Sequence, residues 1–179
     1  MDEVIFRTDW ITVRKSPQGF QYLERKGKDS VAVFLLRRVD GVLEGWEVLV
    51  CHQHLCLDNR QVNGHFRLFP CPVTGALDEG EFPEAAARRE VYEETGYRIK
   101  SIASLGQYIV GTQVNEVCYL FFADVTGDVP DEGDHGLTYL ESVAQLAWHP
   151  LEYLQACDYV ACQIGYFKLV EALAESEME

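Results

Sequence analysis

One helix-forming segment stands among strand-like segments, and this order constrains the fold more than any other feature of the chain. Pro83 suits the first position of a helix, where its missing N–H costs no hydrogen bond. The alanines at 85–87 favour a helix, and Gly96 is placed to end it. Strand-like runs precede this segment and follow it, and a second helical pattern closes the chain. This order predicts an α/β fold, a sandwich built on a mixed sheet.

The other expected elements follow from apolar runs, turn residues and prolines. Pro70 and Pro72 interrupt the run at 66–73, which restricts it to an edge, a bulge or an irregular stretch. The closing helix covers about 159–174, and a loop rich in acidic residues covers 126–141. The expected strands are 4–6, 10–13, 20–23, 31–36, 46–51, 102–110, 117–125 and 143–148.

Charge and hydropathy limit the classes of molecule that this chain of 179 residues is expected to bind. Its formal net charge of −14 disfavours binding to a nucleic acid polymer, whereas bound divalent cations can make an acidic site accept a small phosphate ligand. The longest apolar stretch, at 117–123, is far shorter than a membrane span of about 20 residues. No secretory pattern is present, so we expect a cytoplasmic protein whose six cysteines are reduced and mostly buried.

The predicted central helix carries three glutamates on one face. Glu90, Glu93 and Glu94 are spaced three and four apart, and carboxylates so placed repel one another. A solvated charged surface is one interpretation of such a helix. A cation among the carboxylates is the other, and dense oxygen ligands suit Mg²⁺ or Mn²⁺. Arg89 and Glu81 offer an ion pair that would hold the carboxylates in place.

The spacing around these glutamates favours the metal. The segment resembles the Nudix box, in which Gly, Glu, Arg-Glu, Glu-Glu and Gly stand at fixed intervals. Each residue type has a frequency of roughly 5–7%, so a chance match at one starting point is on the order of 10⁻⁸. The matching residues are Gly75, Glu81, Arg89, Glu90, Glu93, Glu94 and Gly96, with Val91 and Tyr97 at the two bulky positions.

The resemblance implies a fold, a reaction and a ligand set. The fold is the Nudix α/β/α sandwich, and the reaction is hydrolysis of a pyrophosphate bond with two or three divalent ions. Glu90 and Glu94 would be the principal metal ligands, and Glu93 would assist. A turn at Gly75 would bring its carbonyl to the metal. Arg89, Glu90 and Glu93 are accordingly the expected catalytic residues of the helix.

A general base would assist the attacking water. Some members of the family place a glutamate on a loop before the last strand, and Glu141 occupies that position. Glu116 and Glu132 are alternative bases. An ordinary surface carboxylate is the favoured interpretation of Glu116 and Glu132, and for Glu141 the two interpretations are balanced.

The N-terminal part resembles the ADP-ribose and nucleotide-sugar pyrophosphatases. Residues 1–28 would form a strand extension that mediates a homodimer, and residues 29–179 would form the Nudix domain. Trp10 could stack on a base, Arg25 could bind a phosphate and Gln53 could contact the substrate. Packing by Trp10 and a surface ion pair by Arg25 are the alternatives.

The chain also departs from that subfamily. It has no proline in the segment 108–113 after the box, and no arginine two residues after Gln53. These departures count against ADP-ribose itself and leave the hydrolysis intact. From the N-terminal extension we expect hydrolysis of ADP-ribose or a nucleotide sugar to a nucleoside monophosphate and a sugar phosphate, with nucleoside triphosphates as alternative substrates. A non-catalytic nucleotide sensor of the same fold is a further alternative.

A zinc cluster of His52, His54 and Cys56 on one strand face is disfavoured, because the spacing matches no common zinc motif.

Overall fold

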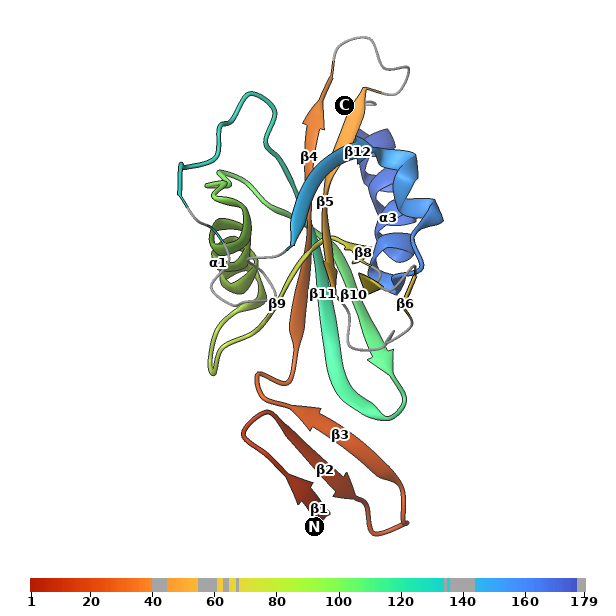
Figure 1. The fold of residues 1–179 in the computed structure, drawn as a ribbon. Helices are drawn as coiled ribbons and strands as arrows, with labels where there is room; N and C mark the ends of the chain where they lie inside the picture. Colours follow the sequence, from red (N-terminus) through yellow and green to blue (C-terminus); the bar gives the residue numbers. More distant parts are fainter. Residues whose placement is uncertain are drawn as a thin grey trace.

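The structure is a computed structural model, and it describes residues 1–39, 45–54, 61–62, 65–66, 68–133, 135 and 144–176. Its elements follow the expected order of strands, helix, strands and helix (Figure 1). The helices are α1 (Pro83–Thr95), the 3₁₀ helix η1 (Leu151–Ala156) and α3 (Val160–Ser176). The strands are β1 (Glu3–Arg7), β2 (Ile11–Lys15), β3 (Gln21–Arg25), β4 (Ser30–Arg38), β5 (Trp46–His54), β6 (Gln61–Val62), β7 (His65–Phe66), β8 (Leu68–Cys71), β9 (Val73–Ala76), β10 (Ala103–Gly111), β11 (Val114–Asp124) and β12 (Gln145–Pro150).

A mixed sheet organises the described part of the chain. Its main path runs β1-β2-β3-β11-β4-β5-β12, and β10, β8 and β9 pair with β11, β5 and β4. Strand β11 runs parallel to β4 and to β3, whereas the remaining pairs are antiparallel. Helix α1 lies on one side of the sheet and α3 on the other (Figure 1), so the predicted sandwich is confirmed.

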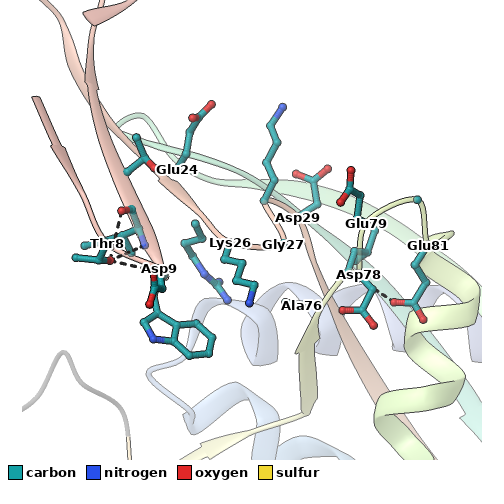
Figure 2. A pocket seen from close by; sticks show the side chains of 17 residues that line it. Thr8, Asp9, Glu24, Lys26, Gly27, Asp29, Ala76, Asp78, Glu79 and Glu81 are labelled. Atoms are coloured by element: carbon teal, nitrogen blue, oxygen red, sulfur yellow. Dashed lines mark hydrogen bonds between the residues drawn. The ribbon is translucent and has the colours of Figure 1, made fainter. Parts of the chain in front are cut away.

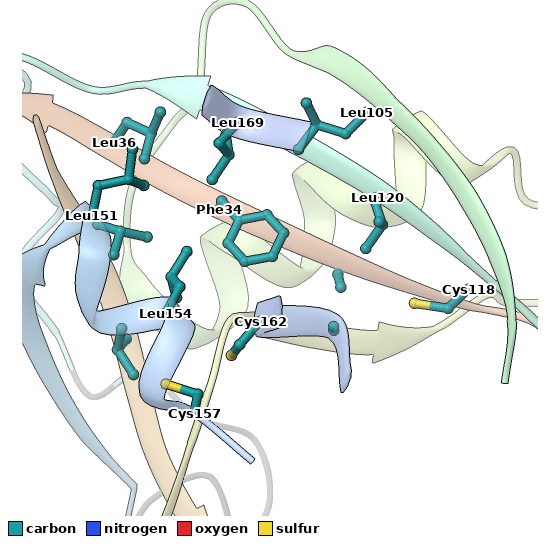
Figure 3. Packing of buried hydrophobic residues seen from close by; sticks show 14 residues of the cluster. Phe34, Leu36, Leu105, Cys118, Leu120, Leu151, Leu154, Cys157, Cys162 and Leu169 are labelled. Carbon is teal, nitrogen blue, oxygen red and sulfur yellow. The ribbon is translucent and has the colours of Figure 1, made fainter. Parts of the chain in front are cut away.

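Strand β4 explains why two helices flank the sheet. Its residues Val31, Val33 and Leu35 pack on the α1 side. Phe34 and its neighbours pack on the α3 side, where leucines and cysteines surround the ring (Figure 3). A strand that is apolar at successive positions must be covered on both faces, because its side chains alternate between them. Helix α3 approaches closely at Gly165, where an added Cβ would lie 2.1 Å from Cζ of Phe34.

The ends of α1 agree with the sequence prediction. Pro83 is the first helical residue, and Gly96 adopts the left-handed conformation with φ of 75°. The backbone N–H of Gly96 donates to the carbonyl of Tyr92, which satisfies one of the last carbonyls of the helix. A side chain at position 96 would also collide with His135, whose Nε2 would lie 2.6 Å from an added Cβ.

The proline-containing segment is divided as expected. Strand β8 ends at Cys71 and β9 begins at Val73, so Pro72 separates them. Among the residues that the structure describes, strand β8 pairs only with β5 and so forms an edge, whereas β9 crosses to pair with β4. Helix η1 was not predicted; its buried residues Leu151 and Leu154 join the core on the α3 side.

The N-terminal strands β1, β2 and β3 form an antiparallel unit beyond the ends of β4 and β11 (Figure 1). Strand β3 meets β11 at a single residue pair, Leu23 with Val114. The five residues of β1 are all exposed. This unit therefore extends the sheet and contributes little to its core.

Two further expectations concern cysteines and membranes. The described cysteines, at positions 51, 71, 118, 157 and 162, are buried, as expected, and the thiols of Cys71, Cys118, Cys157 and Cys162 are free. Within the described residues, no helix combines the length and the apolar character that crossing a membrane would require.

Candidate active site

Glu90 and Gly75 lie against each other between α1 and β9. The side chain of Glu90 is mostly buried, at 8% exposure, although glutamate is rarely buried without a partner. An ideal Cβ on Gly75 would lie 1.8 Å from Cδ of Glu90 and 2.0 Å from its Oε1. The prediction of a turn at Gly75 was wrong, because this residue lies within β9 and pairs with Val31. The position excludes a side chain because the Glu90 carboxyl group occupies that space.

Arg89 joins the carboxylates of the Nudix-like segment. Its Nη1 donates to Oε1 of Glu90 at 2.7 Å and to Oε2 of Glu93 at 3.1 Å. Its Nε and Nη2 donate to the two oxygens of Glu81 at 3.0 and 2.8 Å, and Nη2 also donates to the carbonyl of Ala76. Hydrogen bonds to Glu81 and then to Glu90 raise the pKa of Arg89, so it stays charged. The predicted pairing of Arg89 with Glu81 is present.

Glu81 receives a second set of contacts from the start of its own loop. The backbone N–H of Asp78 donates to Oε2 of Glu81 at 3.0 Å. The Arg89 guanidinium, and to a smaller extent this N–H, lower the pKa of Glu81. A carboxylate so held is ionised at neutral pH. The loop before α1 is thus tied to the helix by Arg89 and Glu81.

Glu94 of α1 lies close enough to Cys71 of β8 to act electrostatically on its thiol. Burial, with a smaller contribution from the negative charge of Glu94, raises the pKa of the Cys71 thiol to about 11. The side chain of Gln53 hydrogen-bonds the same thiol. Gln53 and Glu94 therefore both lie near Cys71.

A pocket of about 890 Å³ opens between the N-terminal strands and the loop before α1 (Figure 2). Asp9 and Lys26 lie on one side of it, and Asp78 and Glu81 on the other. Glu81 links this pocket to the carboxylates of α1 through Arg89. The lining residues are 8–12, 24–29 and 76–81.

Two of the predicted substrate residues line this pocket. Trp10 is 71% exposed, and Nζ of Lys26 lies 5.0 Å from the centroid of its ring. Arg25 lines the same pocket from the end of β3. Gln53 is not among the lining residues.

The candidates for the general base fall in different places. Glu141 lies outside the described residues. Glu116 is 6% exposed, and the guanidinium of Arg25 and the hydroxyl of Ser30 donate to it. Those contacts make Glu116 an ion-pair partner and not the surface carboxylate that the sequence suggested. Glu132 is exposed on the acidic loop.

Sequence reasoning missed several pocket residues. Lys26 and Asp29 were not singled out, although they belong to a charged run between two predicted strands, which was an available signal. Asp29 fixes the pocket wall, because its carbonyl accepts from Leu77 N–H at 3.0 Å and its Oδ1 accepts from Val117 N–H at 3.0 Å. Gly27 has φ of 73°, and its approach to the Leu77 carbonyl leaves no room for a side chain.

The residues present can be tested for their fit to a divalent metal. Among the described residues, no three His, Cys, Asp or Glu side chains converge on one point as a metal would require. Arg89 instead contacts one oxygen each of Glu90 and Glu93. The donors are nevertheless carboxylate and carbonyl oxygens, which Mg²⁺ and Mn²⁺ prefer, and the space at Gly75 admits the Glu90 carboxylate. The chemistry of the donor set therefore fits such an ion.

Comparisons with known proteins identify the family of the chain. A model of the NUDIX domain matches residues 26–165, which is most of the chain. A protein of Bacillus subtilis (strain 168) named "Putative 8-oxo-dGTP diphosphatase YtkD" is 36% identical over 78 residues. That match covers 43% of this chain and 46% of the relative, so it spans less than half of that protein's length.

Solved structures show the same fold. The crystal structure of an ADP compounds hydrolase has a TM-score of 0.66 and 17% identity, and the match covers 98% of this chain and 93% of that one. A binary complex of the C. elegans Ap4A hydrolase has a TM-score of 0.59 and 16% identity, covering 82% of this chain and 98% of that one. Nudix hydrolases generally use divalent metals and act on small nucleotides. With its box, its fold and the match across most of its length, this chain belongs to the NUDIX domain family.

Proposed function

We propose that the protein hydrolyses the pyrophosphate bond of a nucleoside diphosphate derivative, either ADP-ribose or a nucleotide sugar. The products are a nucleoside monophosphate and a sugar phosphate. The observation that carries this proposal is the link between the carboxylates and the pocket. Arg89 holds Glu90 and Glu93 on α1 and at the same time bonds to Glu81, which lines the pocket of about 890 Å³.

Glu90 and Glu94 would be the principal ligands of two or three Mg²⁺ or Mn²⁺ ions, and Glu93 and the carbonyl of Gly75 would assist. When bound, such ions make coordinated water more acidic and neutralise charge that develops on the pyrophosphate. Arg89 orients the carboxylates through the bonds described above. Glu141 accepts a proton from the attacking water as the general base.

The pocket supplies groups for the rest of such a substrate. The exposed ring of Trp10 can stack on a base, and Arg25 can donate to a phosphate. Both come from the N-terminal strands, and Glu81 on the opposite wall belongs to the Nudix box. A substrate with a base at one end and a pyrophosphate in its middle fits this division.

The N-terminal strands also support a homodimer. The side chains of Val4, Ile5 and Phe6 are 43%, 48% and 53% exposed, which leaves an apolar strand uncovered at the edge of the sheet. Exposed apolar edges of this kind favour pairing with another chain. We assign residues 1–28 to dimerisation and residues 29–179 to the catalytic domain.

Nucleoside triphosphates are the second candidate substrates. They are favoured by the partial match to the Bacillus subtilis protein, whose name refers to 8-oxo-dGTP. The N-terminal strands of this chain favour the first candidate, because they build one wall of the pocket. The glutamates of the box argue against a sensor without activity.

A substrate panel distinguishes these functions. The protein is incubated with ADP-ribose, nucleotide sugars, dinucleotides and nucleoside triphosphates, each with Mg²⁺ or Mn²⁺, and the nucleotide product is identified. The proposal expects fastest release of a nucleoside monophosphate from ADP-ribose or a nucleotide sugar. Preferential release of pyrophosphate from a triphosphate would favour the second candidate, and binding without any product would favour a sensor.

A further inference from the structure

Glu116 is a buried carboxylate that connects three strands beside the pocket. It lies on β11, and its side chain is 6% exposed. Ser30, the first residue of β4, donates its hydroxyl to Oε1 of Glu116 at 2.7 Å. Arg25, the last residue of β3, donates Nη1 to Oε1 at 2.8 Å and to Oε2 at 2.9 Å. Burial of a charge is costly unless it is paired and hydrogen-bonded, and these two partners meet that requirement.

The pairing uses one nitrogen of the Arg25 guanidinium. Within the part of the chain that the structure describes, Nε and Nη2 of Arg25 make no hydrogen bond. Arg37 differs, because it turns both Nε and Nη2 to Oε2 of Glu47. Arg89 differs too, since all three of its guanidinium nitrogens are bonded. Arg25 thus combines one anchored nitrogen, two nitrogens without a hydrogen bond among the described residues, and a place in the pocket wall.

Backbone hydrogen bonds hold the chain on either side of Arg25 in place. The N–H of Lys28 donates to the carbonyl of Arg25 at 3.2 Å, and the N–H of Lys26 donates to the carbonyl of Trp10 at 2.8 Å. The side chain of Arg25 remains 43% exposed although its partner is buried. An exposed arginine normally samples many rotamers, and an anchor reduces the entropy that it loses when it binds an anion.

We propose that Glu116, supported by Ser30, is a positioning residue that holds Arg25 with Nε and Nη2 toward a phosphate group in the pocket. This inference rests on the proposed function, because it names the part of the nucleoside diphosphate substrate that Arg25 contacts. Glu116 makes no contact with the substrate and takes no proton in the reaction. Its effect is on substrate binding and is transmitted through Arg25.

The test compares Glu116→Gln with Glu47→Gln in the full chain. Both replacements keep the shape of a side chain that accepts from an arginine and remove its charge. Glu47 and Arg37 are absent from the pocket lining, which makes Glu47→Gln the matched control. With the substrate that the wild type cleaves best, Glu116→Gln should raise KM about tenfold, the effect of weakening one charge-assisted hydrogen bond. It should leave kcat within about threefold of the wild type. Glu47→Gln should change neither constant.

A double variant separates positioning from a general loss of structure. Arg25→Ala should raise KM at least as much as Glu116→Gln, and adding Glu116→Gln to Arg25→Ala should raise it no further, because Glu116 acts through Arg25. Additive effects would overturn the proposal. An unchanged KM in Glu116→Gln would overturn it as well, as would a fall in kcat at constant KM.

A second variant and a binding measurement complete the test of Glu116. If Glu116→Gln does not fold, Ser30→Ala replaces it in the test, because this variant removes only the supporting hydroxyl. Ser30→Ala should raise KM about threefold. An unchanged KM in that variant contradicts the proposal. Calorimetric titration with ADP and Mg²⁺ measures affinity without turnover. A wild type that cleaves no compound of the panel refutes the proposed function, whereas weaker ADP binding by Glu116→Gln would still support the role of Glu116.

Discussion

The carboxyl group of Glu90 occupies the space in which a side chain at Gly75 would lie. An added Cβ would stand 1.8 Å from Cδ of Glu90, closer than any non-bonded contact allows. Gly75 is in a strand without left-handed backbone geometry, so its lack of a side chain serves the approach of the glutamate. The glycine and the glutamate of the Nudix box, Gly75 and Glu90, therefore form a packing contact between β9 and α1.

Gly75→Ala is predicted to displace Glu90 and to lower turnover about a hundredfold or more, because ligand position controls this chemistry. The overpacking should also reduce the free energy of unfolding by about 1–3 kcal/mol. Gly111→Ala is the matched control, since an added Cβ there meets nothing within 4 Å. Steady-state kinetics and urea unfolding of both variants check the prediction. Full activity in Gly75→Ala would contradict the assignment of Glu90.

The Glu81–Arg89 pair predicts a pH dependence of stability. The guanidinium lowers the pKa of Glu81 in the folded state below the unfolded value of about 4.3. The pair thus stabilises the fold above that pH, and the contribution is lost as the pH falls through the folded pKa. Glu81→Gln should therefore destabilise the protein at pH 7 and make little difference near pH 2.

Urea unfolding at both pH values measures this difference. Glu79→Gln, an exposed neighbour on the same loop, is the control and should behave like the wild type at each pH. A Glu81→Gln variant that is as stable as the wild type at pH 7 would contradict the prediction.

Deletion of residues 1–18 is predicted to give a monomer with a raised KM. The deletion removes β1 and β2, the exposed apolar edge and the pocket residues 8–12. Light scattering after gel filtration measures the oligomeric state, and kinetics measure KM. A truncated protein that stays dimeric with unchanged kinetics would refute both roles of the extension.

Trp10→Ala isolates the contribution of the aromatic ring. Loss of one stacked base should raise KM about tenfold while the strands remain in place. Phe20→Ala is the control, because Phe20 is a similarly exposed aromatic residue of the same segment and does not line the pocket. Equal KM values in the two variants would show that Trp10 does not bind the base.

Local chemistry explains which elements could be predicted from the sequence. Pro83 and Gly96 each have one favoured place in a helix, so α1 was predicted almost to the residue. The apolar run of β4 requires cover on both faces, which predicts a layered α/β fold. Helix η1 has six residues, too few to show helical periodicity, and it was missed.

The parts of the site that depend on distant residues could not be predicted. A glycine can serve a turn or a close approach, and only the contact with Glu90 shows which applies at Gly75. Arg25 and Glu116 are 91 positions apart, so their ion pair depends on the pairing of β3 and β4 with β11. Glu116 consequently looked like a surface carboxylate.

The central claim is that the glutamates of α1 bind the divalent ions of a pyrophosphohydrolase, and Glu94→Gln tests it most directly. The measurement is turnover of the best substrate together with Mn²⁺ affinity, for Glu94→Gln and for Glu84→Gln. Glu84 is the control because it lies on the same helix, is exposed and pairs with Arg88. Glu94→Gln should keep the wild-type fold by circular dichroism, lose about a hundredfold or more in turnover and bind Mn²⁺ more weakly. Glu84→Gln should match the wild type. A folded Glu94→Gln variant with wild-type turnover and Mn²⁺ affinity would contradict the account.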